Sequence, residues 1–315
     1  MFILVLNQSN LIQDGQNNKL LYRFPNSVNL TGKYIAVSSV TMYYSWFNIS
    51  EALGNNKFTY TWTVGATSYT YTITIPNGIY EVVGINALAQ FQMIANGTYW
   101  SNGTYNYYPF DIVVNPSRYA VQLNTYQIPT GAPAGTTVPP NPKDPATGQP
   151  INQNAPWPTI AQNPIVTFPS KFSDLIGYTA GFASNANVNN YVLPTPPSAS
   201  NNYVTRSSTN TLSYLSNLAP QLQPNSSVYL SVSNINNPYS QPSSIIYSIT
   251  PNVAAGTVIQ DRPPNFMWTK LIDGTYNQLL LTFLGTNLQP LQIQDPSMTI
   301  LLTIRDKDEA WLGTK

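Results

Sequence analysis

The feature that most constrains the fold of this chain is the recurrence of short runs of Val, Ile, Thr, Tyr and Phe, each bounded by Asn, Gly or Pro. β-Branched and aromatic side chains pack well on a pleated sheet, whereas Asn, Gly and Pro favour the turns between strands. The run KFTYTWTV (57–64) alternates large apolar residues with Thr, and YTYTITI (69–75) repeats the alternation after a loop of hairpin length. Roughly a dozen such runs at irregular spacing predict an all-β fold, a sandwich or a single jelly roll.

One segment, residues 77–97, has the spacing of a helix instead. It reads NGIYEVVGINALAQFQMIANG, with Glu81 in the position of a first turn and Gly97 in the position of a stop. We expect one short helix here, after the fourth strand region, covering one end of a sheet. The apolar residues that fall near helical spacing are Ile79, Val82, Val83, Leu88, Phe91, Met93 and Ile94.

Two proline-rich stretches cannot form central strands. Residues 128–164 and, more briefly, 191–204 are dense in Pro, which lacks the backbone donor that a sheet ladder needs. We expect extended or disordered loops here, which leave the sandwich towards solvent or lie over a neighbouring subunit. Deletion of Pro133–Pro158 is accordingly expected to leave the sandwich folded.

Charged residues are scarce. Only 8% of the 315 residues are Asp, Glu, Lys or Arg, against about 25% in an ordinary soluble domain. A chain with so little charge is often secreted and glycosylated, or it is packed inside an assembly. The net charge is +1 without a basic cluster, which argues against direct nucleic-acid binding because counterion release needs several grouped Lys or Arg.

The sequence also bears on where the protein is made. No apolar run approaches the ~18 residues of a membrane-spanning helix. The opening MFILVL lacks a positive region and a cleavage site, so we interpret it as a first strand and expect synthesis in a cytosol. The Asn-x-Ser/Thr triplets are interpreted as chance in a chain rich in Asn, Ser and Thr.

The residues offer little for catalysis. The chain has neither His nor Cys, which removes the commonest general base, thiolate chemistry and most zinc or iron sites. Paired carboxylates remain as an enzyme route, yet each candidate lies beside a turn or helix start, where a carboxylate normally caps or is solvated. We therefore expect no enzymatic activity, no catalytic or metal-binding residue, no cofactor and no small-molecule substrate. The carboxylates considered are Glu51, Glu81, Asp111 and Asp174 for a cleft, and Asp306, Asp308 and Glu309 for a hard cation.

The densest aromatic run, YIAVSSVTMYYSWFNIS (34–50), carries no charged residue. In its first part apolar and polar residues alternate, as in a central strand. Large residues then follow one another, so that large side chains lie on both faces of the strand and both faces need to be buried. Tyr-rich surfaces serve both sugar binding and protein interfaces. We expect a neighbouring subunit to bury part of this surface. The residues predicted to make that contact are Tyr43, Tyr44, Trp46 and Phe47.

Several blocks of the sequence resemble one protein family. LNQSN, the aromatic run and NNKFTYTW are similar to the N-terminal part of the penton, or minor capsid, proteins of virophages and Polinton-like viruses. IPNGIYEVVGINALAQFQMIANGTY resembles the next block of that family. SNINNPYSQPSSIIYSITP and PLQIQDPSMTILLTIRDK resemble its C-terminal part. The resemblance covers Met1–Tyr105 and Ser226–Lys315 and leaves the proline-rich middle unmatched.

The resemblance implies a single jelly roll that forms homopentamers at the fivefold vertices of an icosahedral capsid, beside a double jelly-roll major capsid protein. It implies a structural protein of the virion, made in the host cytoplasm or a viral factory, with an outward-facing insertion in the middle of the chain. No catalytic or cofactor residues come with the family. We expect the jelly roll to comprise residues 1–126 and 226–315, and the insertion to comprise residues 127–225.

A second class of function stays open, that of a carbohydrate-binding or host-attachment β-protein. The position of the aromatic side chains separates the two classes. An open shelf of loop residues such as Tyr99, Trp100 and Trp157 would favour sugar stacking, whereas rings of the aromatic run in a subunit contact would favour the capsid role.

Overall fold

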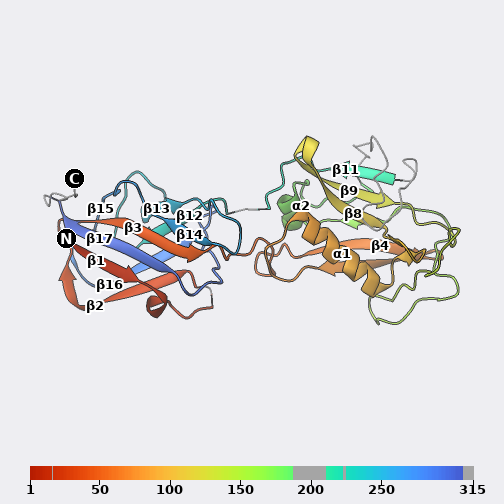
Figure 1. Ribbon diagram of the computed structural model, residues 1–315, viewed down its shortest axis with the longest axis horizontal. Coiled ribbons are helices and arrows are strands. Elements are labelled where there is room, and N and C mark those ends of the chain that lie inside the picture. Colours follow the sequence, from red (N-terminus) through yellow and green to blue (C-terminus); the bar gives the residue numbers. More distant parts are fainter. Residues whose placement is uncertain (16, 187–210, 223–224, 308–315) are drawn as a thin grey trace. The chain divides into compact units, whose positions relative to one another are not determined.

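The computed structural model describes residues 1–15, 17–186, 211–222 and 225–307 (Figure 1). The protein forms two compact units, and the second is inserted into the chain of the first. The chain therefore leaves the first unit once, completes the second, and returns. Unit 1 comprises Met1–Phe47 and Gln223–Lys315, and unit 2 comprises Asn48–Leu222.

Unit 1 is a sandwich of two antiparallel sheets. One sheet has the strand order β1-β17-β3-β14, with β15 also paired to β3, and the other has the order β13-β12-β16-β2. Numbered along unit 1, with β14 and β15 together as the sixth strand, these orders are 1-8-3-6 and 5-4-7-2. They define the jelly roll, so the predicted all-β jelly-roll class is confirmed. The elements are β1 (Phe2–Leu6), η1 (Gln8–Asn10), β2 (Lys19–Asn29), β3 (Lys33–Tyr43), β12 (Val228–Val232), β13 (Ile245–Ile249), β14 (Val258–Asp261), β15 (Thr269–Lys270), β16 (Thr275–Leu284) and β17 (Thr299–Asp306).

The core of unit 1 lies between its two sheets and follows from strand alternation. In β17, Ile300, Leu302 and Ile304 are fully buried, while the leucine between the first two is partly exposed. Leu281 and Phe283 of β16 face them from the second sheet's core positions. Each such side chain stabilises the fold by roughly 1.5–3 kcal/mol relative to an exposed one.

Unit 2 contains two three-stranded antiparallel sheets, with strand orders β10-β4-β5 and β11-β9-β8, and a ribbon of β6 and β7. Aromatic rings fill its core; Phe110, for example, has its ring centroid 6.1 Å from that of Phe58 and 5.3 Å from that of Tyr60. The helix α1 packs against β8 and β5 and lies in the foreground of unit 2 in Figure 1. The elements are β4 (Lys57–Val64), β5 (Thr67–Thr74), α1 (Val82–Asn96), β6 (Trp100–Ser101), β7 (Asn106–Tyr107), β8 (Phe110–Asn115), η2 (Pro116–Arg118), β9 (Ala120–Tyr126), β10 (Val166–Thr167), α2 (Ser170–Ile176) and β11 (Thr211–Leu215).

The predicted helix is confirmed as α1, which ends at Gly97 in the left-handed conformation with a φ of 72°. The structure contains a second helix, α2, that the sequence did not predict. Its apolar residues Phe172, Leu175 and Ile176 are buried. A segment of only seven residues is too short for helical periodicity to stand out beside the neighbouring Pro and Ser residues.

The proline-rich stretch 128–164 contains no strand, as expected, but it packs against the rest of unit 2, which corrects the expectation that it is disordered or leaves the fold towards solvent. The Lys143 ammonium donates to the carbonyl oxygen of Ala95 at 2.8 Å, at the C-terminal end of α1. The indole N–H of Trp62 donates to the carbonyl oxygen of Pro156 at 3.3 Å. Pro lacks an N–H, but its carbonyl and the residues around it keep their hydrogen-bonding groups, and buried groups are almost always paired.

The boundaries of the insertion differ from the expected ones. Residues 48–126 were assigned to the jelly roll, yet they belong to unit 2. The physical reason is strand pairing, because β9 lies between β8 and β11 and so ties the earlier residues to a strand that follows the proline-rich stretch. At the other end, the expected boundary at 225/226 lies close to the observed return to unit 1 after Leu222. The second proline-rich stretch, 191–204, lies outside the described residues.

Candidate interface surfaces

The aromatic run at the end of β3 alternates between the core and the surface. The rings of Tyr44 and Trp46 are buried in the core of unit 1, with their centroids 4.3 Å apart. Tyr43 keeps 45% of its surface exposed, and Phe47 is partly exposed. The structure thus places two of the four predicted contact residues in the core. The predicted subunit contact stays a prediction and rests on Tyr43 and Phe47.

A buried carboxylate fixes the end of this run. Asp295 accepts a hydrogen bond from the amide of Tyr43 at 3.0 Å and another from the amide of Ser297 at 2.7 Å. Its own amide donates to the hydroxyl oxygen of Ser45 at 3.0 Å. The contacts join the end of β3 to the loop before β17 and fix the backbone at Tyr43. Sequence reasoning missed Asp295, because its partner is about 250 residues away and no local pattern marks it.

A second surface lies at the edge of the jelly roll. The strand β1 pairs with β17, and its other side pairs with no strand of the described chain. Ile3 and Val5 are about half exposed, while Leu4 and Leu6 point into the core. Soluble proteins usually protect such an edge with Lys, Pro or a bulge, and FILVL has none of these. An uncharged, apolar free edge is a natural site for another chain.

A third surface is the outer side of α1. Val82, Ile85, Ala89 and Met93 pack into unit 2. Val83, Phe91 and Ile94 lie on the solvent side and are 71%, 68% and 40% exposed. The helix carries no charged residue along its length. A helix that is apolar on both sides is normally covered on both sides.

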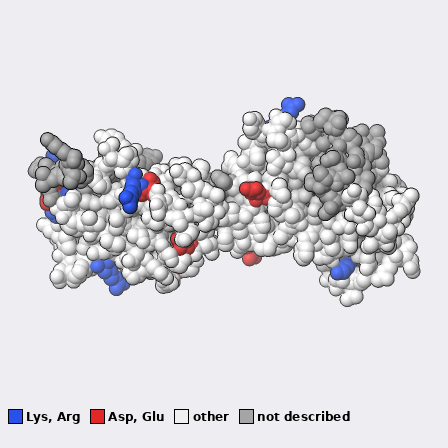
Figure 2. Space-filling model, in the orientation of Figure 1, with Lys and Arg blue, Asp and Glu red and all other residues white. Residues whose placement is uncertain are grey.

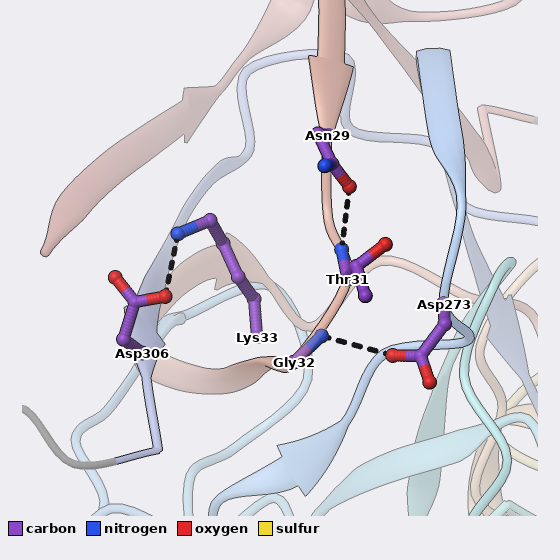
Figure 3. A network of polar contacts seen from close by, with 6 residues as sticks. All are labelled: Asn29, Thr31, Gly32, Lys33, Asp273 and Asp306. Carbon is purple, nitrogen blue, oxygen red and sulfur yellow. Dashed lines mark hydrogen bonds and ion pairs between the residues drawn. The ribbon is translucent and has the colours of Figure 1, made fainter.

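Several charges of unit 1 are used in ion pairs, of which Figure 3 shows the one between Lys33 and Asp306. Lys33 lies 2.8 Å from Asp306, and Lys270 lies 3.0 Å from Asp273. The amide of Gly32, at the turn between β2 and β3, also donates to Asp273 at 2.9 Å. This amide contact and Lys270 lower the pKa of the Asp273 carboxyl from its ordinary value. Figure 2 shows the result, a face on which charged residues are isolated among uncharged ones.

The carboxylates considered for catalysis are structural or peripheral where the structure describes them. Asp111 is buried and accepts hydrogen bonds from the Asn124 amide and the Tyr126 hydroxyl, both at 2.7 Å. Glu81 precedes α1 without a side-chain capping bond. In the described part of the chain, no three His, Cys, Asp or Glu side chains are grouped to hold a metal ion. Of the carboxylates considered for a cation, Asp306 pairs with a lysine, and Asp308 and Glu309 lie outside the described residues.

The loop aromatics do not form an open shelf. Trp100 is only 3% exposed, and its ring stacks on Tyr107 with 5.4 Å between centroids and 3° between planes. Trp157 meets Trp100 edge-on at 5.5 Å. Tyr99 stacks on a neighbouring tyrosine. Trp100 is therefore buried among other rings, whereas Tyr99 and Trp157 are partly exposed and each packs against another aromatic ring, so the three do not form one open stacking surface.

The described helices include none that is long and apolar enough to cross a bilayer.

The strand orders of unit 1 place the protein in the class of jelly-roll proteins, here with a second unit inserted between the third and fourth strands. No protein-family model and no curated protein matches the chain. Among solved structures, the chain is similar to the mavirus penton protein, with 8% identity and a TM-score of 0.40 over 96% of this chain and 98% of that one. It is also similar to a chain in the cryo-EM structure of the Sputnik virophage, with 10% identity and a TM-score of 0.38 over 97% of this chain and 98% of that one.

Proposed function

We propose that the protein is a structural capsid component, a penton subunit that forms homopentamers at the fivefold vertices of an icosahedral virion. The observation that carries the proposal is the eight-stranded jelly roll of unit 1, a topology that recurs in viral capsid proteins. The resemblance of the sequence blocks to penton proteins indicates a position at the fivefold vertices, where the neighbouring protein would be a double jelly-roll major capsid protein. Such a role needs no catalytic residue, cofactor or small-molecule substrate.

The surfaces of unit 1 support a role in an assembly. A ring of identical subunits uses two different patches on each copy, one for each neighbour. The free edge of β1, the exposed ring of Tyr43 and the partly exposed ring of Phe47 offer uncharged contact area, which is the composition of an interface core. The scarcity of charge across the chain is consistent with a surface that neighbouring subunits cover.

We place unit 2 on the outer side of the capsid. Its insertion between two strands of the jelly roll leaves both sheets of unit 1 complete. A unit attached in this way can be presented outward without altering the shell. Limited proteolysis of intact particles tests the placement, because the exposed loops of unit 2 should be cleaved while unit 1 is protected; the reverse pattern would contradict it.

The alternative, a carbohydrate-binding protein, is less well supported. Jelly rolls also occur in lectins, but the rings of Trp100, Tyr107 and Trp157 pack on one another. Glycan-array binding by the isolated protein, lost on Trp157→Ala, would favour this alternative.

The mass of the full chain in solution tests the penton proposal. We expect a concentration-dependent species with five times the mass of the chain, and density for this chain at the fivefold vertices of the particle. The variant Tyr43→Glu should weaken the ring, because an unpaired carboxylate in an interface is strongly unfavourable. Tyr239→Glu is the matched control, since Tyr239 lies in a loop of unit 1 and is 96% exposed. A monodisperse monomer at every concentration, without vertex density, would refute the proposal.

A further inference from the structure

One buried side chain joins the two ends of unit 2. Asn48 is the first residue of this unit and Leu222 is the last. The Nδ2 group of Asn48 donates to the carbonyl oxygen of Leu222 at 2.7 Å and to that of Tyr80 at 2.8 Å. Its Oδ1 atom accepts a hydrogen bond from the amide of Tyr80 at 2.9 Å. Three segments that lie far apart in the sequence are therefore held by one amide group.

The burial of Asn48 makes these contacts costly to lose. Asn48 is only 5% exposed, and its three side-chain hydrogen bonds all go to backbone groups. A buried backbone group that loses its partner pays its full desolvation cost. The side chains of Tyr80 and Leu222 also pack against the core of unit 2, so the two segments have little freedom to find other partners.

A second asparagine holds the entry segment of unit 2 without reaching the exit. Asn55 donates to the carbonyl oxygen of Asn48 at 2.8 Å and accepts a hydrogen bond from the amide of Ser50 at 3.0 Å. These contacts order residues 48–55. Among the hydrogen bonds of the described residues, only that of the Asn48 side chain connects this segment with Leu222.

The exit segment is held to the same unit by its backbone. The amide of Gln221 donates to the carbonyl oxygen of Leu175 at 2.8 Å. Leu175 lies in the last turn of α2, where the helix leaves its carbonyl groups without an internal partner. In the described part of the chain, the bond from Asn48 to Leu222 is the last hydrogen bond before the chain leaves unit 2.

We propose that Asn48 is a clasp that closes the inserted unit on itself where the chain enters and leaves it. Ends held together in this way present unit 1 with a short connection, whereas the closure of a long unfolded loop costs more entropy. The clasp makes unit 2 a separate cooperative unit, which opens and unfolds without unit 1. It concerns the fold of unit 2 and does not depend on the proposed capsid role.

Hydrogen exchange of the full chain, followed by mass spectrometry, tests the clasp. Asn48→Ala removes the side-chain bonds to Tyr80 and Leu222. Exchange in peptides that cover residues 77–82 and 216–222 should therefore become about tenfold faster, because both segments open more often.

Asn55→Ala is the matched control, since it removes another buried asparagine from the same entry segment. It should speed exchange around Ser50, whose amide loses its acceptor, and should leave residues 216–222 within about twofold of the unchanged protein. Peptides from β17, in unit 1, should stay within about twofold in both variants.

Asn48→Asp separates the two parts of the contact. A carboxylate keeps an acceptor for the amide of Tyr80 but has no hydrogen to donate to the carbonyl oxygen of Leu222. Residues 216–222 should therefore exchange faster, while the amide of Tyr80 stays protected. This variant also decides the question if Asn48→Ala does not fold.

Two results would overturn the clasp. One is exchange at residues 216–222 that neither change at Asn48 accelerates. The other is equal acceleration there by Asn55→Ala, which would show a general loosening of the entry segment. Acceleration in β17 equal to that at residues 216–222 would overturn the independence of unit 2 from unit 1.

Discussion

Replacement of Gly97 by alanine should destabilise unit 2 strongly, because two separate demands meet at this residue. Gly97 ends α1 with a φ of 72°, a conformation that a residue with a Cβ rarely adopts. A Cβ built at this position would lie 1.8 Å from the carbonyl oxygen of Asn141 in the proline-rich stretch. The Asn141 backbone is also hydrogen-bonded to Gly97, with its amide 2.9 Å from the Gly97 carbonyl oxygen.

The expected cost follows from these two demands. The left-handed conformation costs about 1–2 kcal/mol for a residue with a Cβ. Asn141 must move by about 1.5 Å to restore an ordinary contact, which breaks its hydrogen bond to Gly97 and the 2.9 Å bond from the Lys143 amide to the Asn96 carbonyl oxygen. Each lost bond costs about 1 kcal/mol. The free energy of unfolding of unit 2 should therefore fall by about 3–4 kcal/mol, within the range of severe single substitutions.

Gly65→Ala is the matched control. Gly65 also lies in unit 2 and has a φ of 61°, but a Cβ there meets nothing within 4 Å. It should cost only the conformational part, about 1–2 kcal/mol. Tryptophan fluorescence in a background with Trp46, Trp268 and Trp311 of unit 1 replaced by Phe reports the urea unfolding of unit 2, which contains Trp62, Trp100 and Trp157. With a slope of about 2 kcal/mol/M, the two variants should differ by about 1 M in midpoint. Equal midpoints would refute the close packing of the proline-rich stretch against α1.

Three further outcomes are expected. Deletion of Pro133–Pro158 should abolish the unfolding transition of unit 2 or lower its urea midpoint, because it removes the carbonyl oxygen that accepts a hydrogen bond from Trp62. The transition of unit 1 should stay in place. An unchanged urea midpoint for unit 2 would contradict the packing of the proline-rich stretch. Asp295→Ala should lower the free energy of unfolding of unit 1 by about 2 kcal/mol, since two amides lose a charged acceptor; thermal melts compared with Asp306→Ala, an exposed carboxylate, check this. Burial raises the pKa of the Tyr178 hydroxyl and, with Asp261 nearby, raises that of Tyr247 to about 12. The stability that such a tyrosine contributes is fully present below the unfolded-state pKa near 10 and is lost as the pH rises through the higher folded-state pKa. Circular dichroism should therefore show unfolding that begins above pH ~10. A protein that stays fully folded beyond pH ~12 would contradict the burial of these hydroxyl groups.

Local patterns predicted the elements that local residues determine. Alternation in KFTYTWTV and the helical spacing before Gly97 each depend on neighbours in sequence, and both elements form as expected. The same alternation, continued through Tyr44 and Trp46, would have assigned these rings to the core. The prediction instead gave weight to their adjacency with Tyr43 and Phe47, although adjacent strand residues point to opposite faces.

The N-terminal boundary of the insertion could not be located from sequence, because it carries no compositional mark. The chain passes from unit 1 to unit 2 between Phe47 and Asn48 without a Gly or Pro linker. The assignment of the proline-rich stretch failed for a related reason. Its order depends on distant partners such as Trp62, and local composition does not encode such contacts.

The position of β17 has a consequence for synthesis. This last strand lies between β1 and β3 in its sheet, so Phe2 is paired with Ile304 across almost the whole chain. Such long-range pairing is slow to form. Every strand of unit 2 pairs within Asn48–Leu222 and is available earlier on the ribosome. The inserted unit can therefore fold first, while β1 waits unpaired for β17, and β3 waits for β14, β15 and β17. Truncations that remove β17 should leave soluble unit 2 attached to an aggregation-prone remainder.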